Sequence, residues 1–505
     1  MNRDLTICFT SDIHGYFSAM DYASGKSSPT VLASCVPTFP DDDNTLILDG
    51  GDTLQGSPFT YWLYNTPGEG ACVPGQIMNL AGYDFVTLGN HDFNYGKEEI
   101  ERYLRQLEGR CLCANVEGIR GVEKTAVVSM KNGLRVGLTG ITSHFVNIWE
   151  KPENLEGITV TDAFDAAGEA LKRLKEEKVD VTVCIYHGGF ENDVKTGAIL
   201  SETGENQGYR ICKELDFDVL LTGHQHQPLE DLCLFGTYTC QPPDRAKQYI
   251  RMEVSVDPSG AVTAQSRLVQ AGDTADQEMA DFLAPLDREN AAFLDTPVGH
   301  LDMALEPKPP LEMAAGGSYI ANFFNQVQLE ASGADISATC LGNQVKGFDR
   351  EVTIRDVVST YIFPNTLKTL RVNRAVLKAA LERSAEYFAL DPQGKLCISD
   401  SFLKPIAQHY NYDYISGLEV TVDVRRPVGE RVVSILYQGK ELEADRDLTL
   451  CLNNYRATGT GGYPLYAQCP LVKDQPTEIA QMIMEYVIAH KEITVDKKQW
   501  LRVLY

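Results

Sequence analysis

The sequence predicts an α/β layered domain over residues 1–273, a polar linker helix over 274–296 and a smaller α+β domain over 297–505. In the first region, short apolar runs alternate with segments of helical spacing, which is typical of α/β layers. A polar, helix-patterned stretch then leads to the proline-rich segment 306–310, which breaks the alternation. The 505 residues fit two or three domains of ordinary size.

Six apolar runs in the first region have the length of β-strands. They cover 5–10, 45–49, 84–88, 134–141, 181–186 and 218–222. Three intervening segments carry the 3.6-residue periodicity of helices, at 74–82, 97–108 and 162–178. In the last segment, one face is lined by Ala163, Ala166, Ala167, Ala170, Leu171 and Leu174, which predicts a helix packed on a sheet.

The polar stretch 274–294 has a helical pattern but no strand partner, so we interpret it as the linker. Beyond it, helices and strands are mixed and the turns are rich in glycine and proline. Helices are expected at 318–332, 373–388 and 476–490, and strands at 418–424, 431–437 and 447–453.

The composition excludes several classes of protein. The formal charge of −25 disfavours long-range attraction to nucleic acids or anionic membranes. No run reaches 18 consecutive apolar residues, and the N-terminus lacks the basic and apolar regions of a signal peptide. The 13 cysteines are odd in number and scattered, and the only close pair is Cys111 and Cys113. We expect reduced thiols in a cytoplasmic protein.

Five segments each end an apolar strand and then present residues of the metal-ligand type. They are Ser11-Asp-Ile-His14, Gly50-Gly-Asp52, Gly89-Asn-His-Asp92, Tyr186-His-Gly188 and Gly223-His-Gln-His226. Any one of them is explained by a turn or an ordinary histidine. Five in succession are not, and loops at the carboxyl ends of strands meet at one edge of an α/β sheet. The sequence therefore predicts that these side chains converge.

The mixture of ligands restricts the metal. Carboxylate, imidazole and one amide oxygen suit Zn²⁺, Mn²⁺, Fe²⁺, Co²⁺ or Ni²⁺, and the absence of thiolates argues against a structural zinc site. Seven ligating side chains are too many for one tetrahedral ion. They fit two divalent ions that share a bridging carboxylate.

The order of these motifs, with the string Gly89-Asn-His-Asp-Phe-Asn-Tyr-Gly96, resembles the calcineurin-like metallophosphoesterases of the 5′-nucleotidase and 2′,3′-cyclic-nucleotide phosphodiesterase family. Three strings in the second half are similar to that family's nucleotide-recognition domain: 361–367, 411–417 and 453–464. The branch with cyclic phosphodiesterase and 3′-nucleotidase activity is the most similar. The resemblance implies a four-layer metallophosphoesterase sandwich, a linker helix and a smaller α+β substrate-recognition domain.

The resemblance also implies roles for individual residues. One ion would be held by Asp12, His14, Asp52 and His226. The other would be held by Asp52, Asn90, His187 and His224, with Asp52 bridging. His91 is not a ligand in the family; it approaches the phosphoryl group as a general acid or as a positive charge.

The chain departs from the family in two places. Several 5′-nucleotidases pair the motif histidine with an aspartate three residues later, where this chain has Asn94. Asn94 or the adjacent Asp92 is expected to orient His91. The family's Asn-x-Gly-Gly-Ile-Arg string is also missing; the segment Cys340-Leu-Gly-Asn-Gln-Val345 stands about where it would be, which makes Asn343 a candidate substrate contact. These departures favour the cyclic-phosphodiesterase branch over a strict 5′-nucleotidase.

Two aromatic rings sandwich the nucleobase in the family, and by position these are Phe363 and Tyr463. Both also have an alternative interpretation as packing residues. Arg456 is either a phosphate or sugar contact or a surface cation.

The sequence thus predicts a two-metal hydrolase of nucleotide phosphate esters, whose partner is a small nucleotide and neither a membrane nor a nucleic acid polymer. A phosphatase of UDP-sugars or other small esters is a second interpretation. A non-catalytic nucleotide sensor is disfavoured by the intact ligand set. The oligomeric state stays open.

Overall fold

The computed structural model describes residues 2–22, 26–27, 31–66, 72–200, 204–363, 365–404 and 407–505. The chain divides into two compact units, Met1–Ala292 and Phe293–Tyr505, which are described separately. Within the described residues, none of the helices combines the length and apolarity that crossing a membrane requires.

Two β-sheets form the centre of the N-terminal unit. The strands of the first, in spatial order, are β17 (Val262–Gln270), β16 (Gln248–Val256), β1 (Arg3–Thr10), β4 (Thr45–Asp49), β5 (Phe85–Val86), β6 (Arg110–Leu112) and β8 (Val122–Glu123). Those of the second are β14 (Leu229–Leu234), β15 (Thr237–Gln241), β13 (Val219–Thr222), β12 (Val181–His187), β10 (Arg135–Thr142) and β9 (Thr125–Ser129).

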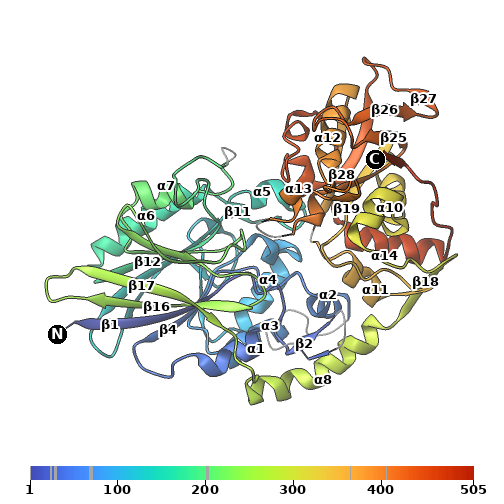
Figure 1. The fold of residues 1–505 in the computed structure, drawn as a ribbon. Coiled ribbons are helices and arrows are strands. Elements are labelled where there is room, and N and C mark those ends of the chain that lie inside the picture. The colour runs from blue at the N-terminus through green and yellow to red at the C-terminus, as the bar shows by residue number, and fades with distance from the viewer. Residues whose placement is uncertain are drawn as a thin grey trace. The chain divides into compact units, whose positions relative to one another are not determined.

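The sheets pack face to face over one apolar core. Alternate residues of β1, such as Leu5, Ile7 and Phe9, meet Val183 and Ile185 of β12 in this core. Helices cover the outer faces (Figure 1). They are α1 (Leu32–Cys35), α2 (Pro58–Asn65), α3 (Cys72–Leu80), α4 (Gly96–Gln106), α5 (Val146–Trp149), α6 (Ala163–Glu176) and α7 (Gly208–Glu214). The predicted four-layer α/β sandwich is confirmed.

The predicted alanine face of α6 packs as expected. Ala163, Ala167 and Ala170 form a buried cluster with Tyr186 of β12 and Leu220 of β13. The expected strand 84–88 is shorter, because only β5 pairs in the sheet before the chain turns into the site loop. The long hairpin of β16 and β17 was not predicted, since its exposed outer residues dilute the apolar signal.

The parallel strands determine where the loops meet. β1 runs parallel to β4, with Thr10 opposite Asp49. In the second sheet, β10, β12 and β13 are parallel. The carboxyl ends of parallel strands lie at one edge of a sheet, so the loops after them are neighbours.

The polar stretch forms helix α8 (Gln277–Leu294). The helix is not solvent-exposed on all sides, since Met279, Leu283 and Leu294 are buried. Asp287 accepts a 2.5 Å hydrogen bond from Ser18 Oγ. Most of α8 therefore packs on the N-terminal unit.

In the described residues, the C-terminal unit contains four sheets, the smallest of which pairs β22 (Phe388–Leu390) with β23 (Leu396–Ile398). The largest has the order β24 (Asp413–Ser416), β19 (Ile336–Cys340), β28 (Leu448–Asn453), β21 (Thr366–Val372) and β29 (Leu471–Glu478). The second has the order β27 (Lys440–Glu441), β26 (Val432–Tyr437), β25 (Leu418–Asp423) and β31 (Leu501–Leu504). The third has the order β20 (Glu351–Thr353), β18 (Pro297–Leu301) and β30 (Glu492–Ile493).

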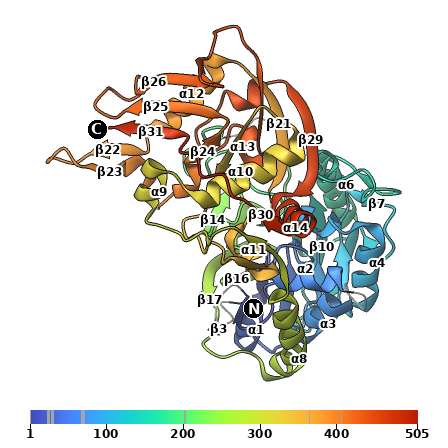
Figure 2. The same ribbon diagram turned by 90° about the vertical axis from the view of Figure 1, so that its right-hand side faces the viewer.

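Six helices accompany these sheets: α9 (Pro310–Gly316), α10 (Tyr319–Ser332), α11 (Ile354–Thr360), α12 (Arg374–Ala385), α13 (Asn454–Ala457) and α14 (Ile479–His490). α10 and α14 pack against each other (Figure 2). The predicted helices and strands of this region occur within a few residues of their expected bounds, and the unit is of mixed α+β type.

Candidate metal centre

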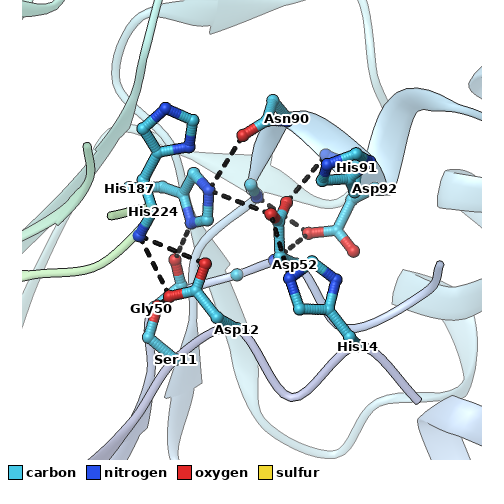
Figure 3. A network of polar contacts seen from close by, with 12 residues as sticks. Ser11, Asp12, His14, Gly50, Asp52, Asn90, His91, Asp92, His187 and His224 are labelled. Carbon is cyan, nitrogen blue, oxygen red and sulfur yellow. Dashed lines mark hydrogen bonds and ion pairs between the residues drawn. The ribbon is translucent and has the colours of Figure 1, made fainter. Parts of the chain in front are cut away.

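The loops after five strands bring the predicted ligands together in the N-terminal unit (Figure 3). Asp12 and His14 follow β1, and Asp52 follows β4. His187 ends β12. The remaining predicted ligands come from the loops after β5 and β13: Asn90, His224 and His226.

The backbone of these loops is strained at the ligands. Twelve non-glycine residues in the described part of the chain have positive φ, and five of them are predicted ligands with φ between 51° and 69°. They are Asp12, His14, Asp52, His224 and His226. Left-handed backbone is unfavourable for such residues and persists where the surroundings enforce it, which is typical of functional sites.

The donor atoms form two overlapping groups, within each of which they lie no more than 4.8 Å apart. One consists of Asp12, His14 and His226, and the other of Asp12, Asp52 and His187. Asp52 Oδ2 is 3.3 Å from His187 Nε2 and 3.8 Å from His14 Nε2. This carboxylate therefore lies between the histidines of the two groups.

Backbone carbonyls orient two of the imidazoles. His14 Nδ1 is 2.9 Å from the Gln55 carbonyl oxygen, and His187 Nδ1 is 2.7 Å from that of Gly50. A carbonyl only accepts, so each Nδ1 donates and each Nε2 keeps its lone pair on the neutral ring. The His187 Nε2 atom also lies 3.1 Å from Asn90 Oδ1. Oriented lone pairs on converging nitrogens are what a metal ion requires.

His224 is held differently. Its Nε2 atom is 2.9 Å from Glu205 Oε1, and its ring stacks on Trp149 with centroids 5.4 Å apart. His224 belongs to neither donor group, although its ring centroid lies 5.5 Å from that of His187. Its backbone N–H donates to the carboxylate of Asp12.

The two carboxylates are deeply buried, with exposed fractions of 0% for Asp12 and 1% for Asp52. Burial alone would raise the pKa of Asp12, but the charge of His226 and its hydrogen bond outweigh burial and lower it. Similarly, burial opposes protonation of His187, but Asp52 raises the pKa of that ring to about 10. Among the described residues, no lysine or arginine forms an ion pair with either carboxylate. In this structure the imidazoles are therefore the charge partners of the carboxylates; divalent ions would take over that role, and the donor set fits such ions.

Asp92 does not orient His91, as one of the two sequence-based alternatives expected. Its carboxylate accepts four backbone N–H bonds of 2.7–2.9 Å, from Gly89, Asp52, Thr53 and Leu54. The function of Asp92 is therefore to shape the loop that carries Asp52.

Asn94 is the partner of His91. Asn94 Oδ1 lies 2.8 Å from His91 Nδ1. The His91 ring lies beside the donor groups, with its centroid 5.4 Å from that of His14, and it belongs to neither group. His91 thus lies beside the two donor groups and outside both of them.

Two residues predicted to bind substrate lie in the interior of the C-terminal unit. Tyr463 is 3% exposed, its hydroxyl bonds Ser384 and the Asn411 carbonyl, and the Arg456 guanidinium lies 4.3 Å from its ring centroid. Arg456 is 1% exposed and pairs with Asp413 at 3.0 Å. In this structure, Tyr463 packs in the interior of the unit and Arg456 is half of a buried ion pair, and their roles as substrate contacts stay predictions.

The other two predicted residues are more accessible. Asn343 is exposed, but its amide donates to the Ala407 carbonyl and accepts from the His409 backbone N–H. It lines a small cavity of about 70 Å³. Phe363 is half-buried and meets Tyr361 edge to face, so part of its ring is open to solvent.

The sequence analysis missed Glu205, Trp149 and Glu150, which contact His224 or Asn94. No motif identifies them, because each reaches the site from a loop or helix end without a characteristic spacing. Their partners are between 19 and 75 residues away along the chain.

Each half of the chain matches a known family model. The calcineurin-like phosphoesterase model matches residues 5–228, and the 5′-nucleotidase C-terminal domain model matches residues 297–468.

Similar proteins extend over the whole chain. A candidate 5′-nucleotidase of Staphylococcus aureus, known as a crystal structure, is 32% identical with a TM-score of 0.79 and full coverage of both chains. A 2′,3′-cyclic-nucleotide 2′-phosphodiesterase/3′-nucleotidase of Haemophilus influenzae is 24% identical over 97% of this chain and 85% of its own. The trifunctional nucleotide phosphoesterase YfkN of Bacillus subtilis is 23% identical over 97% of this chain, which spans only 38% of that protein. The chain belongs to the family of metal-dependent phosphoester hydrolases that join a calcineurin-like phosphoesterase domain to a 5′-nucleotidase C-terminal domain.

Proposed function

We propose that this protein hydrolyses nucleotide phosphate esters at two divalent ions, with 2′,3′-cyclic nucleotides and 3′-nucleotides as its preferred substrates. The observation that carries the proposal is the pair of donor groups around the buried Asp12 and Asp52, with oriented histidine nitrogens. The similarity to the cyclic phosphodiesterase/3′-nucleotidase of Haemophilus influenzae supports the choice of substrate.

In this proposal Asp52 bridges the two ions, although Asp12 is the residue that the two donor groups share. The Asp52 Oδ2 atom faces histidines of both groups, while its Oδ1 accepts a 2.7 Å bond from the His91 backbone N–H. Two ions held here would lower the pKa of a shared water and hold phosphate oxygens for in-line attack. Zn²⁺, Mn²⁺, Co²⁺, Fe²⁺ and Ni²⁺ all suit this mixture of oxygen and nitrogen donors.

His91 is the side chain that acts on the leaving group in this proposal. Its Nδ1 atom is held by Asn94, so Nε2 is free to donate a hydrogen bond to the phosphoryl group or the departing oxygen. Its position beside the ligand His14, but outside the donor groups, supports this role.

Phe363 is proposed to stack on the nucleobase, because part of its ring is solvent-accessible. The structure offers no support for Tyr463 as a second stacking ring. Asn343 stands about where the family's arginine-containing string would be. Its amide group forms hydrogen bonds with the backbone of Ala407 and His409. This supports a substrate other than a strict 5′-nucleotide.

A cytoplasmic location is proposed from the thiols. All 13 cysteines are unpaired, and most are buried. Unpaired thiols in this number are typical of a reducing compartment. Fractionation of the native host, with detection of the protein in the membrane-free lysate and not in the medium or periplasm, would test it.

A substrate panel tests the activity. Purified protein is reconstituted with Mn²⁺, Zn²⁺ or Co²⁺ and assayed on 2′,3′-cyclic, 3′- and 5′-nucleotides, with UDP-sugars as competitors. We expect the cyclic and 3′-nucleotides to give the highest kcat/KM. A preference for UDP-sugars would indicate a phosphatase of another substrate class. Nucleotide binding without turnover would indicate a non-catalytic sensor.

The variant Asp52→Asn tests the metal assignment in the same assay. Loss of the carboxylate charge leaves two like-charged ions without a bridge, so we expect activity to be lost and the bound metal to fall below two ions per chain. Two tightly held ions in this variant would contradict the assignment of Asp52.

A further inference from the structure

His91, Asn94 and Glu150 form a line of hydrogen-bonding groups. Asn94 Oδ1 lies 2.8 Å from His91 Nδ1, and Asn94 Nδ2 donates a 2.6 Å bond to Glu150 Oε2. Glu150 is 56 residues from Asn94 and directly follows helix α5. All three side chains are half-buried.

The carboxylate gives this line a direction. An ionised carboxylate only accepts hydrogen bonds, so Asn94 must turn its NH₂ group toward Glu150 and its carbonyl oxygen toward His91. The imidazole nitrogen facing that oxygen must then carry a proton. Without Glu150, the amide of Asn94 has two orientations, and in one of them His91 Nδ1 becomes the acceptor.

Other contacts hold Glu150 in place. Its Oε1 atom accepts bonds from the Lys151 backbone N–H at 2.7 Å and from Asn154 Nδ2 at 2.9 Å. The same Asn154 amide group donates to the backbone carbonyl of Asn94 at 2.8 Å. The two carboxylate oxygens therefore have separate partners, and Glu150 cannot turn away from Asn94 without losing several bonds.

We propose that Glu150 is a positioning residue for the reaction: through Asn94, it fixes the tautomer and the ring orientation of His91, so that Nε2 faces the substrate. The inference rests on the proposed function, in which His91 contacts the phosphoryl group or the leaving oxygen. Glu150 itself touches neither the donor groups nor His91.

The adjacent Trp149 supports a positioning role for this end of α5. Its ring stacks on His224, while Glu150 reaches toward His91. One turn of chain thus supports two imidazoles that enter the site from different loops.

The first test replaces Glu150 with glutamine, which keeps the size but also donates hydrogen bonds, so the direction of the Asn94 amide is no longer imposed. We expect kcat on 2′,3′-cyclic and 3′-nucleotides to fall about 10- to 100-fold, with KM and metal content unchanged. Glu153→Gln is the matched control, because Glu153 is an exposed acid three residues away. Unchanged kcat in Glu150→Gln would overturn the proposal, and so would parallel losses of metal, melting temperature and kcat.

A double-mutant cycle tests whether the effect passes through Asn94. Asn94→Ala removes the connection, so adding Glu150→Gln to it should lower kcat no further. If the two losses multiply, Glu150 acts by another route and the proposed line is wrong.

A spectroscopic readout separates this inference from the proposed function. ¹⁵N NMR of the imidazoles in the zinc-loaded protein, with His91 assigned from His91→Gln, reports which ring nitrogen carries the proton. We expect Nδ1–H in the wild type and a mixture of tautomers in Glu150→Gln. This result would stand even if the substrate panel showed no nucleotide turnover, whereas identical His91 spectra in the two proteins would overturn the inference alone.

Discussion

At the residue scale, the two aromatic side chains predicted to clamp a base have separate roles. Phe363 is half-buried, whereas the Tyr463 ring lies against Arg456 and its hydroxyl is bonded on two sides. Tyr463 can be buried because its hydroxyl finds hydrogen-bond partners in Ser384 and the Asn411 carbonyl.

Alanine variants of these residues should therefore differ. Phe363→Ala should raise KM for nucleotides by about 5- to 150-fold, because one stacking contact is worth about 1–3 kcal/mol. Tyr463→Ala should instead lower the free energy of unfolding by about 3–5 kcal/mol. Kinetics on a nucleotide and on p-nitrophenyl phosphate, with denaturant unfolding of both variants, would check this. A selective nucleotide KM effect in Tyr463→Ala would restore it as a clamp.

Asp287 on α8 illustrates the cost of a buried charge. The side chain is buried, Ser18 supplies its one recorded hydrogen bond, and within the described residues Oδ1 has no partner. Burial raises its pKa, although the Ser18 bond acts in the opposite direction.

The pH dependence follows from the sign of this shift. The folded state binds the proton of Asp287 more tightly than the unfolded state does, so the contribution of this group to stability is greatest at low pH and declines as the pH rises through the raised pKa. Asp287→Asn should therefore raise the melting temperature at pH 8, with a difference that shrinks toward pH 4. Glu289→Gln, at an exposed position of the same helix, is the control. A variant less stable than the wild type at pH 8 would contradict the argument.

At the element scale, the close approach of the β4 and β5 loops depends on Gly89. A Cβ atom there would lie 2.2 Å from Asp52 Oδ1 and 2.6 Å from His187 Cε1. The φ of −94° at Gly89 is ordinary, so the requirement is for space and not for backbone freedom.

Gly89→Ala should displace both ligands. A shift of about 1 Å can cost 10²-fold in rate, so we expect a loss of at least that order, together with weaker metal binding. Gly168→Ala is the control, because a Cβ on α6 would meet its nearest neighbour, Leu215, at an ordinary 3.5 Å. Metal titration and kcat measurements would check both. Full activity of Gly89→Ala would mean that the loops are not packed as described.

At the scale of the whole molecule, metal binding and folding should be linked. Without metal ions, the buried Asp12 and Asp52 have only histidines as ionic partners within the part of the chain that the structure describes. A ligand at 100 times its Kd stabilises the folded state by about 2.7 kcal/mol per site. Chelation should therefore lower the melting temperature, and added Zn²⁺ or Mn²⁺ should restore it. Calorimetry of the wild type and Asp52→Asn, with and without metal, would measure this. A wild-type melting temperature that does not change with metal would contradict the proposed metal site.

The order of strands and ligand loops was readable from the sequence, because apolar runs and the residues after them are local signals. β1, β4, β10, β12 and β13 occur within a residue or two of their predicted bounds. β14 and β15 were not anticipated: β14 is largely exposed, and β15 is mostly buried but consists of Thr, Tyr, Cys and Gln, which form no apolar run.

The sequence by itself determined the candidate metal ligands, because residue type and position after a strand are local signals. Only the tertiary structure decided that Asp92 shapes a loop and that Asn94 faces His91. It also decided that Tyr463 is covered and that Glu150 reaches the site. These outcomes depend on contacts between residues distant in the chain and on competition for hydrogen-bond partners, which neither periodicity nor motif spacing contains.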